Sequence, residues 1–141
     1  MRVLFHDPEL CTACRTCEDV CSDTFYRQKD AEKSKIRIHN EGGGLPAASF
    51  CNQCGECIDV CPTVALYRDK RGVVRLQREL CVGCLTCVGF CPTAVMFWHA
   101  DEMYPFKCVS CGMCERECPE GALTTVEVDE VPAPAEPYRS A

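Results

Sequence analysis

We expect this chain to adopt a small, loop-rich α+β fold, and three features of its sequence predict that class. Sixteen cysteines stand in four groups of identical spacing, and they divide the chain into short segments. The runs that are rich in β-branched and aromatic residues are brief and bounded by turn residues, as short strands are. The segments with helical potential are equally brief, so no long helix is expected.

The predicted elements follow one another along the chain. In sequence order the strand candidates are residues 3–5, 36–38, 65–68, 73–76, 96–98 and 124–128. Residues 69–72 contain Asp and Gly between the third and fourth candidates, and this pattern predicts a hairpin. The second half of each cysteine group, such as residues 57–61, is long enough for a helix of one or two turns.

The four cysteine groups, which we call quartets, all have the spacing C-x2-C-x2-C-x3-C. Pro62, Pro92 and Pro119 follow the last cysteine of quartets two, three and four, whereas Ser22 stands there in quartet one. The segments CPTVAL, CPTAVM and CPEGAL extend the similarity past the cysteines, so the chain is built on a fourfold repeat. The quartets are Cys11, Cys14, Cys17 and Cys21; Cys51, Cys54, Cys57 and Cys61; Cys81, Cys84, Cys87 and Cys91; and Cys108, Cys111, Cys114 and Cys118.

This spacing is typical of [4Fe–4S] clusters. A cubane needs one thiolate on each of four irons, and three cysteines separated by two residues wrap a tight loop around three corners. The same loop directs backbone N–H groups toward the sulfurs. In two-cluster ferredoxins the fourth cysteine, often followed by Pro, reaches to the other cluster. The quartets therefore predict four [4Fe–4S] clusters on sixteen cysteines.

Other uses of the cysteines fit the pattern less well. Zinc ribbons hold two C-x2-C pairs a dozen or more residues apart and need no third cysteine in each group. A disulfide framework does not require four equal spacings, and no cysteine stands outside the quartets as a nucleophile. His6, His39 and His99 are interpreted as loop histidines. Nothing pairs a base with a nucleophile, so we expect no catalytic residue and no substrate site of the chain's own.

Charge and composition narrow the partners and the compartment. The net charge is −6, and each oxidised cluster with its thiolates adds about two negative charges. Nucleic acid is therefore excluded as a partner by repulsion. The first ten residues contain Asp7 and Glu9 and do not resemble a signal peptide. No apolar run is long enough to span a bilayer, so a cytoplasmic protein is expected, whose folding depends on metal loading.

Two segments lie outside the repeat within the expected domain layout. Residues 1–128 are predicted to form one four-cluster domain, with residues 22–50 as an insert and residues 129–141 as an extended, Pro-rich tail. The insert is interpreted either as a solvated loop with a strand or as a basic docking surface. The tail is either idle or an arm that lies on a partner. The basic residues of the insert are Arg27, Lys29, Lys33, Lys35 and Arg37.

The chain up to about Val128 resembles the four-cluster iron–sulfur subunits of molybdenum and tungsten oxidoreductases and of hydrogenase or carbon monoxide dehydrogenase systems. The segment DPELCTACRTCEDVCS, followed by a basic stretch and an IRI strand, is most similar to the small ferredoxin-like subunit of tungsten-containing aldehyde oxidoreductases. The resemblance implies two interleaved bacterial-type 2[4Fe–4S] ferredoxin-like modules with the clusters as their core. Quartet one then pairs with quartet four, and quartet two with quartet three. The implied ligand sets are Cys11, Cys14, Cys17 and Cys118; Cys108, Cys111, Cys114 and Cys21; Cys51, Cys54, Cys57 and Cys91; and Cys81, Cys84, Cys87 and Cys61.

The function that we expect is electron transfer through four clusters, as the iron–sulfur subunit of a multi-subunit oxidoreductase. The resemblance implies a catalytic subunit with a tungsten- or molybdenum-pterin cofactor that oxidises aldehydes, and a flavin-containing subunit or another acceptor. A row of clusters has two ends, so an uncovered end is also a place for a second copy of this chain. Two alternatives stay open at this point: a free-standing soluble polyferredoxin and a maturation factor that only holds clusters.

Overall fold

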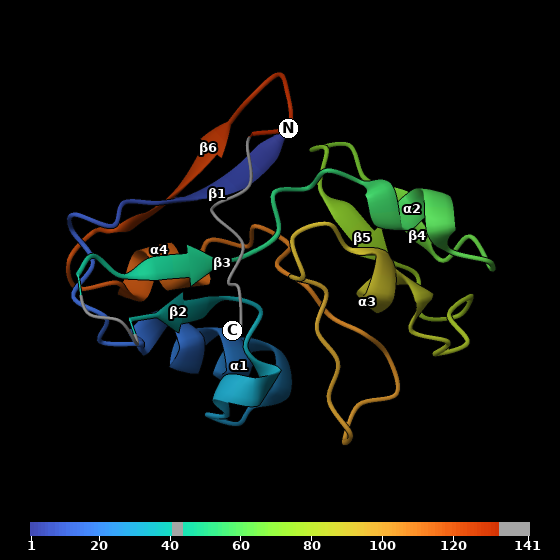
Figure 1. The fold of residues 1–141 in the computed structure, drawn as a ribbon, viewed down its shortest axis with the longest axis horizontal. Coiled ribbons are helices and arrows are strands. Elements are labelled where there is room, and N and C mark those ends of the chain that lie inside the picture. The colour runs from blue at the N-terminus through green and yellow to red at the C-terminus, as the bar shows by residue number, and fades with distance from the viewer. Residues whose placement is uncertain (41–43, 133–141) are drawn as a thin grey trace.

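The computed structural model of the chain describes residues 1–40 and 44–132. It contains three two-stranded antiparallel sheets and four helices, joined by long loops within those residues (Figure 1). The elements are, in chain order, β1 (Arg2–His6), α1 (Thr16–Tyr26), the 3-10 helix η1 (Ala31–Lys33), β2 (Arg37–His39), β3 (Ala47–Ser49), α2 (Glu56–Val60), β4 (Leu66–Arg68), β5 (Val74–Leu76), α3 (Thr86–Phe90), α4 (Met113–Glu117) and β6 (Leu123–Glu127).

The two ends of the described chain come together in one half of the molecule. Strand β1 pairs with β6 in antiparallel register, from Arg2 opposite Glu127 to His6 opposite Leu123. Helix α1 packs against α4 beneath this sheet (Figure 1). The buried core of this half joins apolar side chains to cysteines of quartets one and four: Leu4, Ile36, Ile38, Ala48 and Leu123 with Cys17, Cys21 and Cys114.

The middle of the chain forms the other half. Hairpin strands β4 and β5 pair with Leu66 opposite Leu76, and helix α2 packs against α3 (Figure 1). Leu66, Val74 and Met96 form a buried cluster with Cys57 and Cys87, which come from quartets two and three. Because cysteines make up much of both cores, each core has few apolar side chains of its own.

Most of the predicted strands are confirmed. Residues 3–5 and 124–128 correspond to β1 and β6, residues 65–68 and 73–76 form the predicted hairpin, and residues 36–38 correspond to β2. The strand predicted at residues 96–98 is wrong, because only an isolated bridge between Phe97 and Phe106 forms there. Phe97 and Phe106 exchange both backbone hydrogen bonds, but the next carbonyl that could continue the ladder, that of His99, accepts from Glu102 N–H in a turn instead.

The prolines after the quartets explain where the helices end. Helices α2, α3 and α4 all stop one residue before the last cysteine of their quartet, and those cysteines are extended, with ψ of 117°, 118° and 115°. A residue that precedes proline is driven out of the helical region by the proline ring. Ser22 applies no such restriction, so α1 continues through Cys21 to Tyr26. The expectation of helices of one or two turns is therefore wrong for quartet one.

Candidate metal centres

Each quartet folds into the same loop. The residue before the second cysteine and the residue after it both have a positive φ in all four quartets. Such left-handed residues alternate with right-handed ones in backbone nests, whose N–H groups point to one side and bind anions. A non-glycine residue in this conformation costs about 1–3 kcal/mol, so an anionic body held by the loop offsets that strain. The residue pairs are Ala13 and Arg15, Gln53 and Gly55, Gly83 and Leu85, and Ser110 and Gly112.

Backbone N–H groups donate to the sulfurs of several cysteines. Gln53 donates to Cys51 Sγ at 3.2 Å, and Ser110 donates to Cys108 Sγ at 3.4 Å. After the last cysteine of quartet two, Ala65 donates to Cys61 Sγ at 3.3 Å, and Val95 does the same for Cys91 at 3.4 Å. In quartet one this donor comes instead from the insert, where Lys35 N donates to Cys21 Sγ at 3.2 Å.

These hydrogen bonds favour the thiolate, which is the form that binds metal. Burial alone raises the pKa of Cys61, but the backbone N–H of Ala65 and the hydroxyl of Thr63 outweigh it and lower the pKa overall. Thr93 and Val95 act in the same way on Cys91, lowering its pKa against the effect of burial. The turn after the quartet therefore prepares its last cysteine for ligation.

Three cavities are each lined by four cysteines. Site 1 contains three cysteines of quartet one and one of quartet four, site 2 has the reverse composition, and site 3 contains three of quartet two and one of quartet three. The cysteines are Cys11, Cys14, Cys17 and Cys118 at site 1; Cys21, Cys108, Cys111 and Cys114 at site 2; and Cys51, Cys54, Cys57 and Cys91 at site 3.

The remaining four cysteines gather at a fourth place. Cys61 is close enough to Cys84 and Cys87 to raise the pKa of both thiols. At Cys84 this effect is smaller than that of hydrogen bonding, and at Cys87 it is smaller than that of burial. Cys81 acts on Cys87 in the same way. We refer to Cys61, Cys81, Cys84 and Cys87 as site 4.

The donor sets fit a cluster better than a single ion. Among residues 1–40 and 44–132, no group of three His, Cys, Asp or Glu side chains is placed to hold one metal ion. A cubane requires each thiolate on a different iron, so its ligands surround a body rather than converge on a point. Four thiols around one cavity, with N–H groups directed at sulfur, are the donors that such a body needs.

Several buried or half-buried cysteines connect neighbouring sites. Burial raises the pKa of Cys114 to about 12, and repulsion from Cys111 and Cys17 adds to the increase, which links site 2 to site 1. Burial also raises the pKa of Cys108 to about 12, with Cys51 of site 3 contributing.

Site 3 is linked to site 4 in the same way. Burial raises the pKa of Cys57 to about 11, and Cys87 is among the thiols that contribute. The four sites therefore stand as a row in which each neighbours the next. Thiols with such pKa values are protonated at neutral pH, so metal binding must displace their protons.

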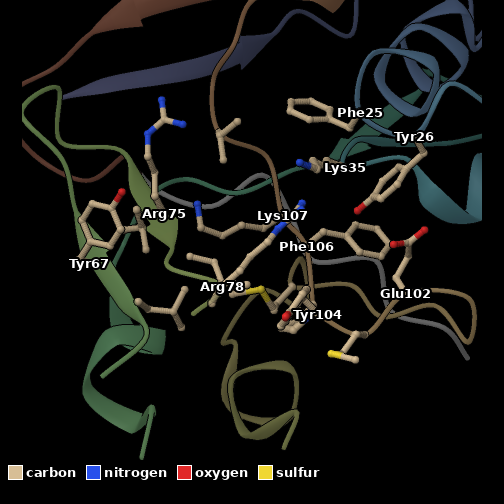
Figure 2. A pocket seen from close by; sticks show the side chains of 17 residues that line it. Phe25, Tyr26, Lys35, Tyr67, Arg75, Arg78, Glu102, Tyr104, Phe106 and Lys107 are labelled. Atoms are coloured by element: carbon tan, nitrogen blue, oxygen red, sulfur yellow. The ribbon is translucent and has the colours of Figure 1, made fainter. Parts of the chain in front are cut away.

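A groove of about 420 Å³ lies beside sites 2 and 3 (Figure 2). Aromatic and cationic side chains line it together: Arg78 lies over the ring of Tyr104 at 5.7 Å, and Lys35 lies over that of Phe25 at 3.3 Å. Among the described residues that line the groove, no nucleophile stands beside a base. The sequence did not predict this groove, because its walls come from segments far apart in the chain.

The basic residues of the insert are mostly engaged inside the molecule. Lys33 is only 3% exposed and pairs with Asp101 and Glu102 at 3.6 and 3.4 Å. Arg37 donates to the carbonyl of Glu32 at 2.8 Å and lies over the ring of Phe97. The interpretation of the insert as a basic docking surface is therefore wrong for these residues, and Arg27 and Lys29 are the basic residues of the insert that are exposed.

The histidines do not all behave as loop residues. His39 contacts Ser49 Oγ at 2.9 Å, and His99 faces Asp30 and Glu32. His6 lines the cavity of site 1, where its buried Nε2 has no hydrogen-bond partner among the described residues. No spacing in the sequence pointed to His6, because strand β1 brings it to the site.

Comparison with known proteins identifies the kind of centre. Three family models, each described as a 4Fe-4S dicluster domain, match residues 10–66, 50–95 and 73–119. The chain is a ferredoxin-like 4Fe-4S protein. In this ferredoxin-like chain each match spans two successive quartets, so all sixteen cysteines fall within a matched region.

Curated relatives resemble nearly the whole chain. The B subunit of the anaerobic dimethyl sulfoxide reductase of Haemophilus influenzae is 29% identical over 154 residues, covering 90% of this chain and 74% of that protein. The protein NrfC of Escherichia coli K12 is 31% identical, covering 90% and 66%, and the uncharacterised ferredoxin-like protein YdhX of the same strain is 31% identical, covering 85% and 62%. This ferredoxin-like chain thus spans about two thirds of the length of several of these relatives.

A solved structure supports the fold alone. The active-site complex BamBC of benzoyl coenzyme A reductase, with 1,5-dienoyl-CoA, contains a chain with a TM-score of 0.50 and 22% identity, covering all of this chain and 83% of that one. Across the part of the chain that the structure describes, none of the helices has the length and apolar character that crossing a membrane requires.

Proposed function

We propose that this chain is the electron-transfer subunit of a multi-subunit oxidoreductase and that it holds four [4Fe–4S] clusters. The observation that carries the proposal is the row of sites 1 to 4, in which cysteines of neighbouring sites pack in shared buried clusters. A carrier that receives and releases electrons at one place does not need four sites in line. The relatives named as components of dimethyl sulfoxide reductases support the subunit role.

The proposed ligands are the four cysteines of each site, and the proposed fold is a pair of interleaved modules. Quartets one and four supply sites 1 and 2, while quartets two and three supply sites 3 and 4. Support comes from the packing of α1 on α4 and of α2 on α3. Anaerobically prepared protein is expected to contain about sixteen iron and sixteen sulfide per chain. Reproducible zinc with little iron would contradict this assignment.

The chain's own residues bind, orient and insulate these centres. When bound, a [4Fe–4S] cluster accepts and releases single electrons. The left-handed residues Gln53 and Ser110 donate N–H groups to sulfur. The buried cores keep water from Cys17, Cys57 and Cys114. Phe97 and Phe106 pack beside Cys51 and are proposed to shield site 3 from water, whereas Trp98 is 52% exposed.

The two ends of the row are accessible from outside. Cys14 at site 1 and Cys84 at site 4 are both exposed, as is Cys111 at site 2. What distinguishes site 4 is that large exposed apolar side chains stand near its cysteines in sequence: Val64, Leu80, Val82 and Phe90. Exposed apolar surface is typical of protein interfaces. We therefore propose that a partner covers site 4.

The finer identity of the partner is also a proposal. The resemblance of residues 7–22, together with a relative named as part of a dimethyl sulfoxide reductase, supports a catalytic subunit with a molybdenum- or tungsten-pterin cofactor. We propose an aldehyde oxidoreductase as the catalytic partner. A flavin subunit or another acceptor is proposed at the other end of the row of sites. An end of the row that neither partner covers could contact a second copy of this chain. Residues 129–141 are proposed to lie on the partner, and most of them are outside the described residues. The proposed location is the cytoplasm.

Anaerobic purification of the untagged protein from its native source, followed by mass spectrometry and metal analysis, tests this proposal. We expect co-purification with a large pterin enzyme that reduces this chain faster than it reduces an unrelated ferredoxin. Val82→Asp should weaken the complex, while Leu45→Asp, a change at an exposed apolar residue outside the four quartets, should not. Deletion of residues 129–141 should weaken it as well, with the cluster spectrum unchanged. Elution of the native protein alone would favour a free polyferredoxin, and rapid cluster loss to an apo-enzyme would favour a maturation factor.

A further inference from the structure

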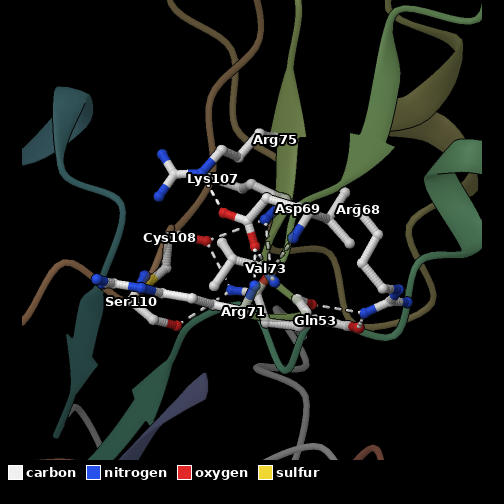
Figure 3. Close-up of polar contacts among 11 residues, drawn as sticks. Gln53, Arg68, Asp69, Arg71, Val73, Arg75, Lys107, Cys108 and Ser110 are labelled. Atoms are coloured by element: carbon white, nitrogen blue, oxygen red, sulfur yellow. Dashed lines mark hydrogen bonds and ion pairs between the residues drawn. The ribbon is translucent and has the colours of Figure 1, made fainter. Parts of the chain in front are cut away.

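A buried lysine stands at the junction between sites 2 and 3. Lys107 is only 6% exposed, and its ammonium donates to Gln53 Oε1 at 2.9 Å and to the carbonyl of Cys108 at 3.0 Å (Figure 3). Its charge acts on Cys51 and Cys57, both of which belong to site 3. No carboxylate pairs with it among the described residues, so the cysteines of site 3 are the anions that it faces when they ionise.

Gln53 holds this lysine in place and joins the two halves of the molecule. The side chain is completely buried. Its Nε2 donates to the carbonyl of Cys108 at 2.9 Å and to Ser110 Oγ at 3.3 Å, while its Oε1 also accepts from Val74 N at 3.0 Å (Figure 3). An amide has two donor and two acceptor positions, and all four are used here. The loop of quartet two is thereby fixed against the loop of quartet four.

A second lysine occupies the equivalent place beside site 2. Lys35 donates its backbone N–H to Cys21 Sγ at 3.2 Å, and its ammonium packs on the ring of Phe25. Lys35 lines the cavity of site 2, and its charge acts on three of the four cysteines there, Cys21, Cys108 and Cys111. Figure 2 shows Lys35 and Lys107 at the same groove, Lys35 on the insert and Lys107 on the segment just before quartet four.

We propose that Lys35 and Lys107 set the reduction potentials at the crossing between the two modules, Lys35 at site 2 and Lys107 at site 3, with Gln53 as the positioning residue for Lys107. This inference rests on the proposed function, since it requires clusters at both sites. A cluster gains one negative charge when it is reduced, so a fixed positive charge nearby favours the reduced form. The effect is strong in a buried environment because the effective dielectric constant is low.

Cys51 of site 3 and Cys108 of site 2 meet at the crossing, because they pack in one buried cluster and Cys51 raises the pKa of Cys108. Passage of one electron between the modules oxidises the centre at one of these sites by one electron and reduces the other by one. A lysine on each side allows the two potentials to be set separately.

The test is a redox titration of the anaerobically reconstituted full chain, followed by electron paramagnetic resonance. Signals are assigned to sites with Cys111→Ser and Cys54→Ser. We expect Lys107→Gln to lower the reduction equilibrium constant of site 3 at least tenfold, which is about 59 mV for one electron, with little change at site 2. Lys35→Gln should lower the reduction equilibrium constant of site 2 by a similar factor, with little change at site 3. Lys70→Gln removes an exposed lysine of the same charge and should move neither potential.

Three further variants separate charge from structure. Lys107→Met keeps the length of the side chain without its charge and should reproduce the shift, while Lys107→Arg keeps the charge and should restore most of the potential. Gln53→Leu should lower the potential of site 3 because Lys107 loses its position. Equal shifts at both sites, or shifts no larger than that of Lys70→Gln, would overturn the proposal. These potentials are measured on the chain without any partner. Failure to find an oxidoreductase complex would therefore refute the proposed subunit role and leave the proposal about the two lysines standing.

Discussion

Replacing Ser22 by proline tests why quartet one differs from the other three. In α1 this residue is fully buried, its Oγ donates to the carbonyl of Asp19 at 3.1 Å, and it accepts from the N–H of Asp30 at 3.1 Å. Proline inside a helix costs about 3 kcal/mol or more, and each lost hydrogen bond costs about 1 kcal/mol. Ser22→Pro should therefore destabilise the protein by about 5 kcal/mol, a large part of a typical stability of about 5–15 kcal/mol.

The matched control is Ser22→Ala, which removes both hydrogen bonds but leaves the helix intact and costs about 2 kcal/mol. With a urea dependence of about 2 kcal/mol per molar, the unfolding midpoint should fall by about 2.5 M for the proline variant and by about 1 M for alanine. The assay is anaerobic urea unfolding, followed by circular dichroism and by the visible absorbance of the clusters. Equal midpoints for the two variants would refute the account of how proline ends the other helices.

Three further predictions concern individual side chains. Cys118→Ser should perturb the cluster held by quartet one and spare the cluster held by the first three cysteines of quartet four, as judged by electron paramagnetic resonance, whereas perturbation of the latter alone would contradict the ligand sets. Burial, opposed by Arg15, raises the pKa of Glu18 above its ordinary 4.5, so folding takes up a proton and stability falls as the pH rises through the interval above 4.5. Glu18→Gln should therefore raise the urea midpoint at pH 7, with a gain that vanishes toward pH 4.5. Buried His6 Nε2 lines site 1 without a hydrogen-bond partner among the described residues, and we expect it to donate to a bound cluster. His6→Phe, which removes a hydrogen bond of about 1 kcal/mol, should then lower the potential of site 1 by about 40 mV in a redox titration.

The repeat made much of the fold predictable, because the same spacing recurs in every quartet. The four loops, three of the helices and the hairpin of β4 and β5 all follow from local patterns. Strand β3 was missed because Ala47 to Ser49 carries no strand signal and forms a strand only by pairing with β2. The location of Lys33 was also missed, because its partners Asp101 and Glu102 lie far away in the chain.

The cysteines that line each candidate centre could be grouped from the sequence, but the surroundings of the centres could not be predicted. Cysteine spacing points to clusters without any knowledge of the fold, since the loop that binds three irons is local. The charges that act on a cluster come instead from segments remote in sequence. Lys107 precedes a quartet and Lys35 lies in the insert. No sequence pattern around them distinguishes these two lysines from the exposed Lys29 and Lys70. Tertiary packing alone determines which lysines face the cysteines.

The departure from the repeat at Ser22 explains how the two halves of the molecule pack together. Where proline ends the other helices, α1 continues for another turn and brings Tyr26 to the ring of Phe106, with centroids 5.6 Å apart. Phe106 bridges to Phe97 in the middle of the chain, so the extra turn packs one half of the molecule onto the other. The insert that follows then returns along α1 and delivers Lys35 to Cys21. A proline after Cys21 would remove this turn and with it the contact between Tyr26 and Phe106. The absence of proline in quartet one therefore allows the contact that packs the half with site 2 onto the half with site 3.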